Sequence, residues 1–156
     1  MEILQLRPGI VLRPATEADV EALFTIRTSV RENHQSRAEL ARIGVTPGSV
    51  ARMLRTDCAA WLVEIRGEPV AFSMANATDR SVFAMFVRPG YEGQGFGRAL
   101  MQCAEEWLFA RGADEIWLAT GSNPSLRAHG FYRHLGWEEA GKLADGQVKY
   151  AKKRKF

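Results

Sequence analysis

Three alternating glycines, Gly93, Gly95 and Gly97, mark the segment of this chain best suited to chemistry. An apolar run over residues 82–87 and a turn at Pro89-Gly90 precede them, and a helical pattern follows. Glycine lacks a Cβ atom, so its backbone approaches an anion closely and points several N–H groups the same way. A helix that begins here adds unpaired donors and the positive end of its dipole. The segment therefore predicts a site for phosphate oxygens.

Two common phosphate loops do not fit these residues. The Walker loop requires Lys-Ser or Lys-Thr after its last glycine, whereas Arg98 follows Gly97. The dinucleotide fingerprint requires glycine where Arg98 stands. Its acidic residue belongs at the end of the second strand, whereas Asp114 and Glu115 precede the strand expected over residues 116–119.

A third loop fits better. Residues 92–97 (EGQGFG) resemble the pyrophosphate loop of the GNAT acetyltransferase superfamily, Gln/Arg-x-x-Gly-x-Gly/Ala, with Glu92 as a departure at its first position. Residues 87–91 (VRPGY) resemble the family's lead-in. The resemblance implies acetyl-CoA as acyl donor, held partly by backbone groups, and we expect the Glu92 side chain to point to solvent. The cofactor-binding residues implied are Phe86, Val87, Glu92, Gly93, Gln94, Gly95, Phe96, Gly97 and Arg98.

Residues 125–137 (SLRAHGFYRHLGW) resemble the second signature of the same family, Asn-x-x-Ala-x-x-Phe/Leu-Tyr followed by Gly-Phe. Ser125 stands where Asn is usual, so it either contacts the cofactor or caps a helix. The role that the resemblance implies for Tyr132 is that of general acid toward the departing sulfur of coenzyme A. The alternative for Tyr132 is a core aromatic with a satisfied hydroxyl.

No residue stands out as the base that deprotonates the acceptor amine. Glu64, Glu32 and His34 are candidates, and each is also an ordinary surface or salt-bridging group. His129 and His134 lie five positions apart rather than the four that would place them on one helix face, so we expect no metal site.

Apolar periodicity predicts the elements that position these residues. Strands are expected over residues 10–13, 61–65, 70–74, 81–87, 116–119, 137–140 and 147–152, the last two joined by a turn at 145–146. Helices are expected over residues 16–31, 36–43, from 46–47, 96–110 and 125–135. This order indicates a single α/β domain over residues 1–156, with a central sheet covered by helices. The resemblance implies a GNAT-type, mostly antiparallel central sheet of about six to seven strands flanked by helices.

Composition limits the other possibilities. The net charge is +3, and five basic residues crowd a C-terminal tail, 149–156, that we expect to be solvated and partly frayed. No aromatic interleaving accompanies them, so nucleic acid is not a favoured partner. The sequence shows neither a secretory signal nor a run long enough to span a membrane, which predicts a cytoplasmic protein.

The resemblance to the GNAT superfamily implies an acetyl-CoA-dependent N-acetyltransferase, and we expect its acceptor to be a small polar amine or a peptide or protein amine. Two alternatives stay open: a non-catalytic acyl-CoA-binding regulatory module, and an enzyme that acetylates an aminoacyl-tRNA amine. A homodimer paired through the C-terminal strands is compatible with the strand order.

Overall fold

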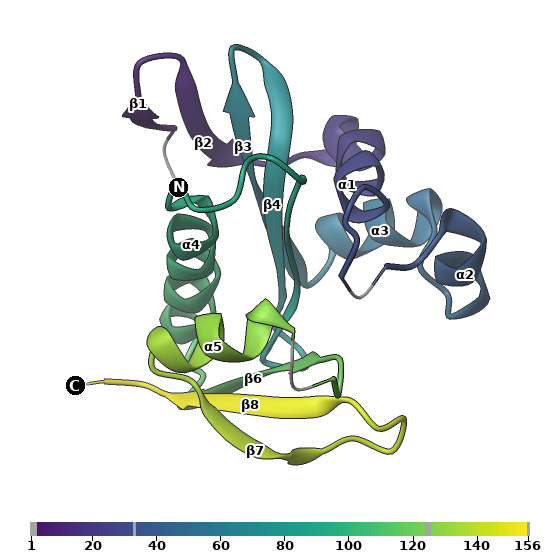
Figure 1. Cartoon of the computed structure of the whole chain (residues 1–156), viewed down its shortest axis with the longest axis vertical. Coiled ribbons are helices and arrows are strands. Elements are labelled where there is room, and N and C mark those ends of the chain that lie inside the picture. The colour runs from purple at the N-terminus through teal and green to yellow at the C-terminus, as the bar shows by residue number, and fades with distance from the viewer. Residues whose placement is uncertain (1–2, 33, 124–125, 156) are drawn as a thin grey trace.

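The computed structural model describes residues 3–32, 34–123 and 126–155. Within these ranges one eight-stranded sheet carries five α-helices (Figure 1). The strands are β1 (Leu4–Arg7), β2 (Ile10–Pro14), β3 (Cys58–Ile65), β4 (Glu68–Asn76), β5 (Ser81–Val87), β6 (Glu115–Thr120), β7 (Glu138–Lys142) and β8 (Val148–Lys153). The helices are α1 (Val20–Arg27), α2 (Arg37–Arg42), α3 (Pro47–Arg55), α4 (Phe96–Ala110) and α5 (Arg127–His134), and a 3-10 turn over Glu17–Asp19 leads into α1.

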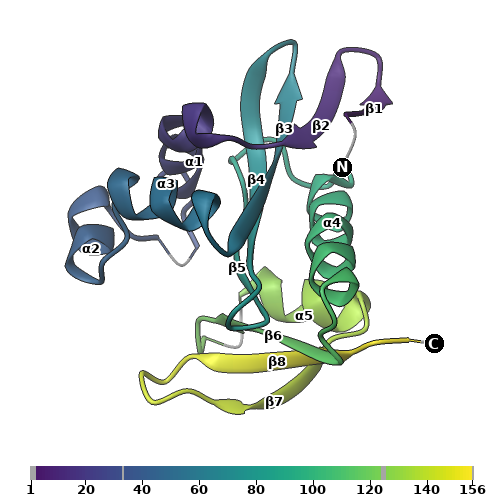
Figure 2. The ribbon, with the colours of Figure 1, turned by 180° about the vertical axis from the view of Figure 1, so that it is seen from behind.

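Helices cover both faces of the sheet. α4 packs on one face and α1 to α3 pack on the other (Figures 1 and 2). Each face has its own core, built on Leu100 and Leu108 of α4 and on Leu23 and Phe24 of α1. In the ranges described, no helix is long and apolar enough to cross a membrane.

The sheet order is β1-β2-β3-β4-β5-β6-β8-β7, and every pairing is antiparallel except that of β5 with β6. In the described part of the chain these two strands share a single registered pair, Ser81 with Trp117. β6 and β8 then run across the end of β5 (Figures 1 and 2). The sheet therefore opens between β5 and β6 toward the glycine loop.

The predicted fold class is confirmed, with one strand more than expected. β1 pairs with β2 through a turn at Gly9, whose φ of 76° lies in the left-handed region that favours glycine. Only four residues long, at the edge of the sheet and largely exposed, β1 has too little apolar alternation to be recognised. The expected 145–146 hairpin is confirmed, because the Gly146 N–H donates to the carbonyl of Leu143 at 2.9 Å.

Two expectations overlap at the C-terminus: the strand over residues 147–152 is confirmed, and the frayed basic tail over residues 149–156 is wrong for most of that segment. Residues up to Lys153 belong to β8, which pairs with β6 and β7. The Lys152 ammonium lies 2.7 Å from the carboxylate of Glu105, and the Arg154 guanidinium donates to the carbonyl of Phe109. These basic groups thus join the C-terminal strand to α4.

Candidate active site

A cavity of about 810 Å³ fills the gap between β5 and β6, a size typical of ligand sites. The glycine loop closes one end of it and α5 covers its side. The structure brings together here nine of the eleven residues predicted for the site: Phe86, Val87, Glu92, Gly93, Gly95, Phe96, Gly97, Arg98 and Tyr132. Gln94 is in the loop but does not line the cavity, and Ser125 lies outside the described residues.

The backbone of the loop has the conformation of an anion cradle. Gly90, Gly93 and Gly95 have φ values of 93°, 75° and 85°, which side chains rarely permit. Gly95 is the N-cap of α4, so the unpaired N–H groups of the first helical turn open onto the cavity. Gly97 serves a different purpose, because a Cβ atom there would lie 3.1 Å from the ring of Phe131. It lets α5 approach α4 closely.

The backbone of β5 offers hydrogen bonds to an extended ligand arm. The N–H of Arg88 donates to Val70 of β4 at 2.9 Å, and successive residues of a strand face opposite neighbours. The backbone groups of Val87 and Met85 therefore face the open side, while those of Phe86 face β4. The sequence predicted backbone contacts from Phe86 and Val87. The observed alternation favours Val87 with Met85, and Phe86 is among the residues that line the cavity.

The Glu92 side chain is exposed, as expected, but its carboxylate is held at the loop. Its carboxylate folds back onto the loop, where it accepts from the N–H of Gly90 at 2.5 Å and lies 3.2 Å from the guanidinium of Arg127. Arg127 also lies 3.8 Å from Glu32, which precedes α2. Three segments are thus linked across the mouth of the cavity. The role of Arg127 was not anticipated, because its partners are distant in the sequence.

Tyr132 lies on the inner wall of the cavity. It is buried among Phe131, Trp137 and Tyr150, with ring centroids between 5.3 and 6.3 Å away. Burial disfavours the phenolate and raises the pKa of Tyr132 to about 12. The hydroxyl is therefore protonated at neutral pH, as a hydrogen-bond donor must be.

His129 helps to fix the helix that carries Tyr132. Its Nδ1 lies 2.8 Å from the hydroxyl of Tyr150 on β8, and its Nε2 lies 3.0 Å from the carbonyl of Gly121 after β6. A neutral ring satisfies both contacts, with Nε2–H donating to the carbonyl and Nδ1 accepting from the phenol. This buried histidine joins α5 to two strands.

Of the three candidate bases, Glu64 is displaced from the site. It lies on β3, pairs with Arg13 and lines neither of the two cavities described here. Glu32 lines the cavity mouth but is turned toward Arg127. His34 is exposed and contacts the carbonyl of Thr28 at 3.2 Å. None of the three has the position of a dedicated base.

Arg98 and Arg88 flank the loop but face different partners. Arg88 pairs with Glu68 at 2.9 Å, whereas Arg98 is exposed in the first turn of α4 and lines the cavity. A residue that the sequence did not reveal is Arg7 of β1, whose guanidinium donates to the carbonyl of Gln94 at 2.9 Å and lies over the ring of Phe96. The extra edge strand thus supports the glycine loop.

The model of the GNAT acetyltransferase family matches residues 19–137, a span that includes β5, the glycine loop and α5. The chain belongs to the GNAT family. This confirms the resemblance carried by the two motifs.

A curated relative of this GNAT chain is similar in sequence. An uncharacterized N-acetyltransferase of Methanocaldococcus jannaschii is 31% identical over an alignment of 98 residues, and the match covers 56% of this chain and 42% of that protein. The chain thus spans less than half the length of this curated relative.

Two solved structures are also similar. The PaiA N-acetyltransferase of Thermoplasma acidophilum, in complex with coenzyme A, superposes with a TM-score of 0.78 at 14% identity and covers 93% of this chain and 99% of its own. The ribosomal-protein-S18-alanine N-acetyltransferase of Escherichia coli gives 0.67 at 20% identity, over 91% and 90% of the two chains. At these identities the likeness establishes the shared fold.

We expect Glu92→Gln to bind acetyl-CoA several-fold more tightly. In the wild type, hydrogen bonds from the Glu92 backbone N–H and from Arg127 hold the pKa of the Glu92 carboxyl below its usual range. The carboxylate is therefore charged at neutral pH. A unit charge about 4 Å from a phosphate charge costs about 1 kcal/mol in water, or roughly fivefold in affinity. Calorimetric titration measures the change. Glu138→Gln, on exposed β7, is the matched control, and equal or weaker binding by Glu92→Gln would contradict the expectation.

Proposed function

We propose that this protein is an N-acetyltransferase that moves the acetyl group of acetyl-CoA directly to a primary amine. One observation carries the proposal: a second cavity, of about 400 Å³, lies on the α1 side of β5 and shares lining with the glycine-loop cavity. The shared residues are Val82, Phe83, Ala84, Phe86 and Ala119. A donor in the first cavity and an acceptor in the second would meet at β5.

The conformation of β5 also suits a reaction between groups bound in the two cavities. Ala84 pairs with Met74 and Val82 pairs with Ala75, so Phe83 is an extra residue, a β-bulge. A bulge bends its strand and redirects its side chains. It lies where the two cavities adjoin, and the N–H of Met85 or Val87 on the open side is placed to donate to the thioester oxygen as negative charge develops there.

The reaction balances without an acyl-enzyme. The neutral amine nitrogen attacks the thioester carbonyl carbon, a C–N bond forms, and the C–S bond breaks. The sulfur leaves with the bonding electrons and takes a proton, and the nitrogen loses one. The products are an amide and the free thiol of coenzyme A.

Tyr132 is the proposed hydrogen-bond donor to the departing sulfur. A phenol with a pKa of about 12 is a weaker acid than a thiol, whose usual pKa is about 8.5. Proton transfer from the phenol to a free thiolate is therefore uphill. Tyr132 acts chiefly by donating a hydrogen bond that stabilises the departing thiolate, and the proton lost by the amine balances the reaction.

A thermal-shift assay followed by a thiol-release assay tests the function. We expect acetyl-CoA to raise the melting temperature and to release thiol in the presence of an accepting amine. Burial raises the pKa of Cys58 to about 12 and that of Cys103 to about 11, so the protein's thiols add little background at neutral pH. If no acyl-CoA raises the melting temperature, the proposal that acetyl-CoA is the acyl donor is excluded. Stabilisation without thiol release over a broad amine panel would indicate the regulatory acyl-CoA-binding module instead.

A further inference from the structure

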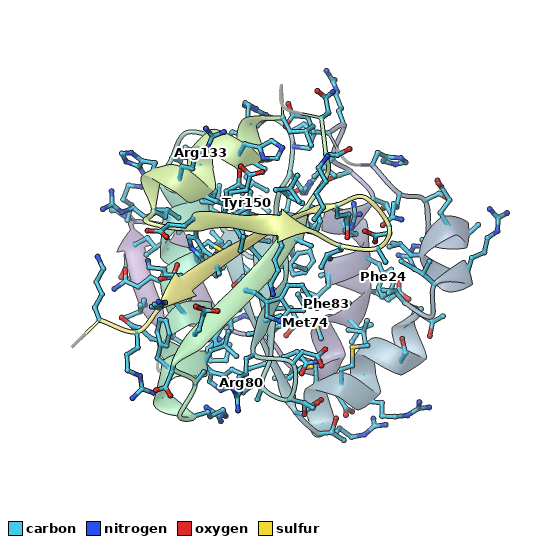
Figure 3. All side chains as sticks on the ribbon, turned by 90° about the horizontal axis from the view of Figure 1, so that it is seen from below. Phe24, Met74, Arg80, Phe83, Arg133 and Tyr150 are labelled. Carbon is cyan, nitrogen blue, oxygen red and sulfur yellow. The ribbon has the colours of Figure 1, made fainter. Side chains whose placement is uncertain are left out.

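The acceptor-side cavity is mainly apolar. Figure 3 shows Phe24, Met74 and Phe83 gathered beside α1, and all three line the cavity. Further apolar lining comes from Leu23, Leu40, Ile43, Val45, Val50, Phe72 and Phe86. Such a lining favours an acceptor with an apolar part, and the volume of about 400 Å³ suits a molecule of amino-acid size.

Among the described residues that line this cavity, Arg27 is the one cation. The residue ends α1, is half-buried, and places its guanidinium 4.2 Å from the ring centroid of Phe86 on β5. Its Nη2 donates to the side-chain oxygen of Gln35 at 2.9 Å. Its Nη1 is buried and has no hydrogen-bond partner among the described residues. A buried donor without a partner is costly, so it is expected to have a purpose.

Arg27 differs from the five arginines of the described chain that pair with a carboxylate. Arg13, Arg37, Arg55, Arg88 and Arg127 each lie within 4.0 Å of a carboxylate oxygen. Arg27 makes no such ion pair in the part of the chain that is described. Asp79, the acidic residue among the described lining of this cavity, is exposed in the turn between β4 and β5 and does not pair with it. The protein thus maintains an uncompensated positive charge in an apolar pocket.

We propose that Arg27 binds a carboxylate of the acceptor, and that the acceptor is a free α-amino acid with an apolar side chain. The proposal rests on the proposed function and names its substrate class. Guanidinium and carboxylate match in two parallel hydrogen bonds. Because Arg27 lies on Phe86, which lines both cavities, a carboxylate bound there holds an amine on the adjacent carbon close to β5. The apolar side chain then occupies the pocket lined by Phe24 and Met74.

Substrate comparison tests this directly. Thiol release at saturating acetyl-CoA is measured with leucine, with leucinamide, which lacks the negative charge, and with isoamylamine, which lacks the carboxylate. We expect kcat/KM for leucine to exceed that for the other two by at least about tenfold, since hydrogen bonds between charged groups contribute that much. Equal or greater kcat/KM for isoamylamine or leucinamide would overturn the inference and leave the acetyltransferase function standing.

Arg27→Gln tests the residue. We expect it to raise KM for leucine about tenfold or more, with little change for isoamylamine, and Arg27→Lys to recover part of the loss. Arg37→Gln is the matched control, because the Arg37 guanidinium also lies over an aromatic ring, that of Phe24, but is exposed and paired with Glu21. An unchanged KM for leucine in Arg27→Gln would contradict the proposal.

A binding measurement separates this inference from the proposed function. Calorimetric titration with N-acetylleucine, the expected product, requires no turnover. We expect it to bind the wild-type protein and to bind Arg27→Gln at least tenfold more weakly, while acetyl-CoA stabilises both proteins equally. If N-acetylleucine does not bind the wild-type protein, or binds Arg27→Gln as tightly as the wild type, the inference is overturned whatever the thiol assay shows.

Discussion

Replacing Tyr132 by Phe is expected to lower kcat by about 10²-fold and to leave the affinity for acetyl-CoA nearly unchanged. The substitution removes one oxygen and keeps the ring that packs against Phe131, Trp137 and Tyr150. The loss is set at the lower end of the usual range for a proton donor, about 10²–10⁴, because a thiolate is already a tolerable leaving group. Steady-state kinetics and titration of acetyl-CoA on the same variant provide the two numbers.

The pH dependence sharpens this test. Since burial raises the pKa of Tyr132 to about 12, the phenol stays protonated as the acceptor amine loses its proton. We therefore expect kcat/KM of the wild type to rise with pH to a plateau, without a descending limb from this group below about pH 10. Tyr150→Phe is the matched comparison, since it removes a neighbouring buried hydroxyl that bonds His129. A larger loss of kcat in Tyr150→Phe than in Tyr132→Phe would contradict the proposed role.

Gly95→Ala is expected to weaken acetyl-CoA binding by about 10- to 100-fold. At φ 85° a Cβ atom strains the backbone by roughly 1–2 kcal/mol. The same methyl group stands where a phosphate would approach the N-terminus of α4, and it disturbs hydrogen bonds to that anion. Titration with acetyl-CoA and with coenzyme A, which has the same pyrophosphate, measures the loss.

Gly112→Ala distinguishes the effect of backbone strain from the effect of disturbed hydrogen bonds to the phosphate. Gly112 lies just beyond the other end of the same helix, with φ 94°, and at both glycines a Cβ atom would meet nothing within 4 Å. The backbone strain is therefore similar, while only Gly95 borders the cavity. We expect Gly112→Ala to lower the free energy of unfolding by a similar amount and to bind acetyl-CoA normally. Equal affinities in the two variants would show that the loop does not hold the phosphates.

The donor side was largely predictable from the sequence because its determinants are local. Glycines that need left-handed φ values, a strand before them and a helix after them all fall within residues 82–110, and α4 ends at Ala110 as its apolar face predicted. In the second motif, Tyr132 lies in α5 and Gly136 comes just after the end of the same helix. Short-range spacing therefore specified most of the cleft lining.

The remaining features depend on contacts between distant segments. Arg27 and Phe86 are separated by most of the N-terminal half of the chain, and Arg127 meets Glu32 only after α5 folds over the cleft. Arg7 reaches Gln94 through a strand of four residues, which is too short to be recognised. Lys152 reads as part of a solvated tail until its pairing with Glu105 on α4 is seen. Sequence periodicity concerns residues of one helix or strand, so it does not reveal contacts between distant segments.

A single strand, β5, forms a wall of both cavities, so under the proposed function both substrates can be bound at the same time. Because the two substrates would enter from opposite faces of the sheet, neither has to leave before the other arrives. The enzyme would work through a ternary complex. The product coenzyme A would then block the binding of fresh acetyl-CoA but would leave the acceptor-side cavity accessible to the amine. Cellular acetyl-CoA and coenzyme A levels would then regulate its rate independently of the supply of amine.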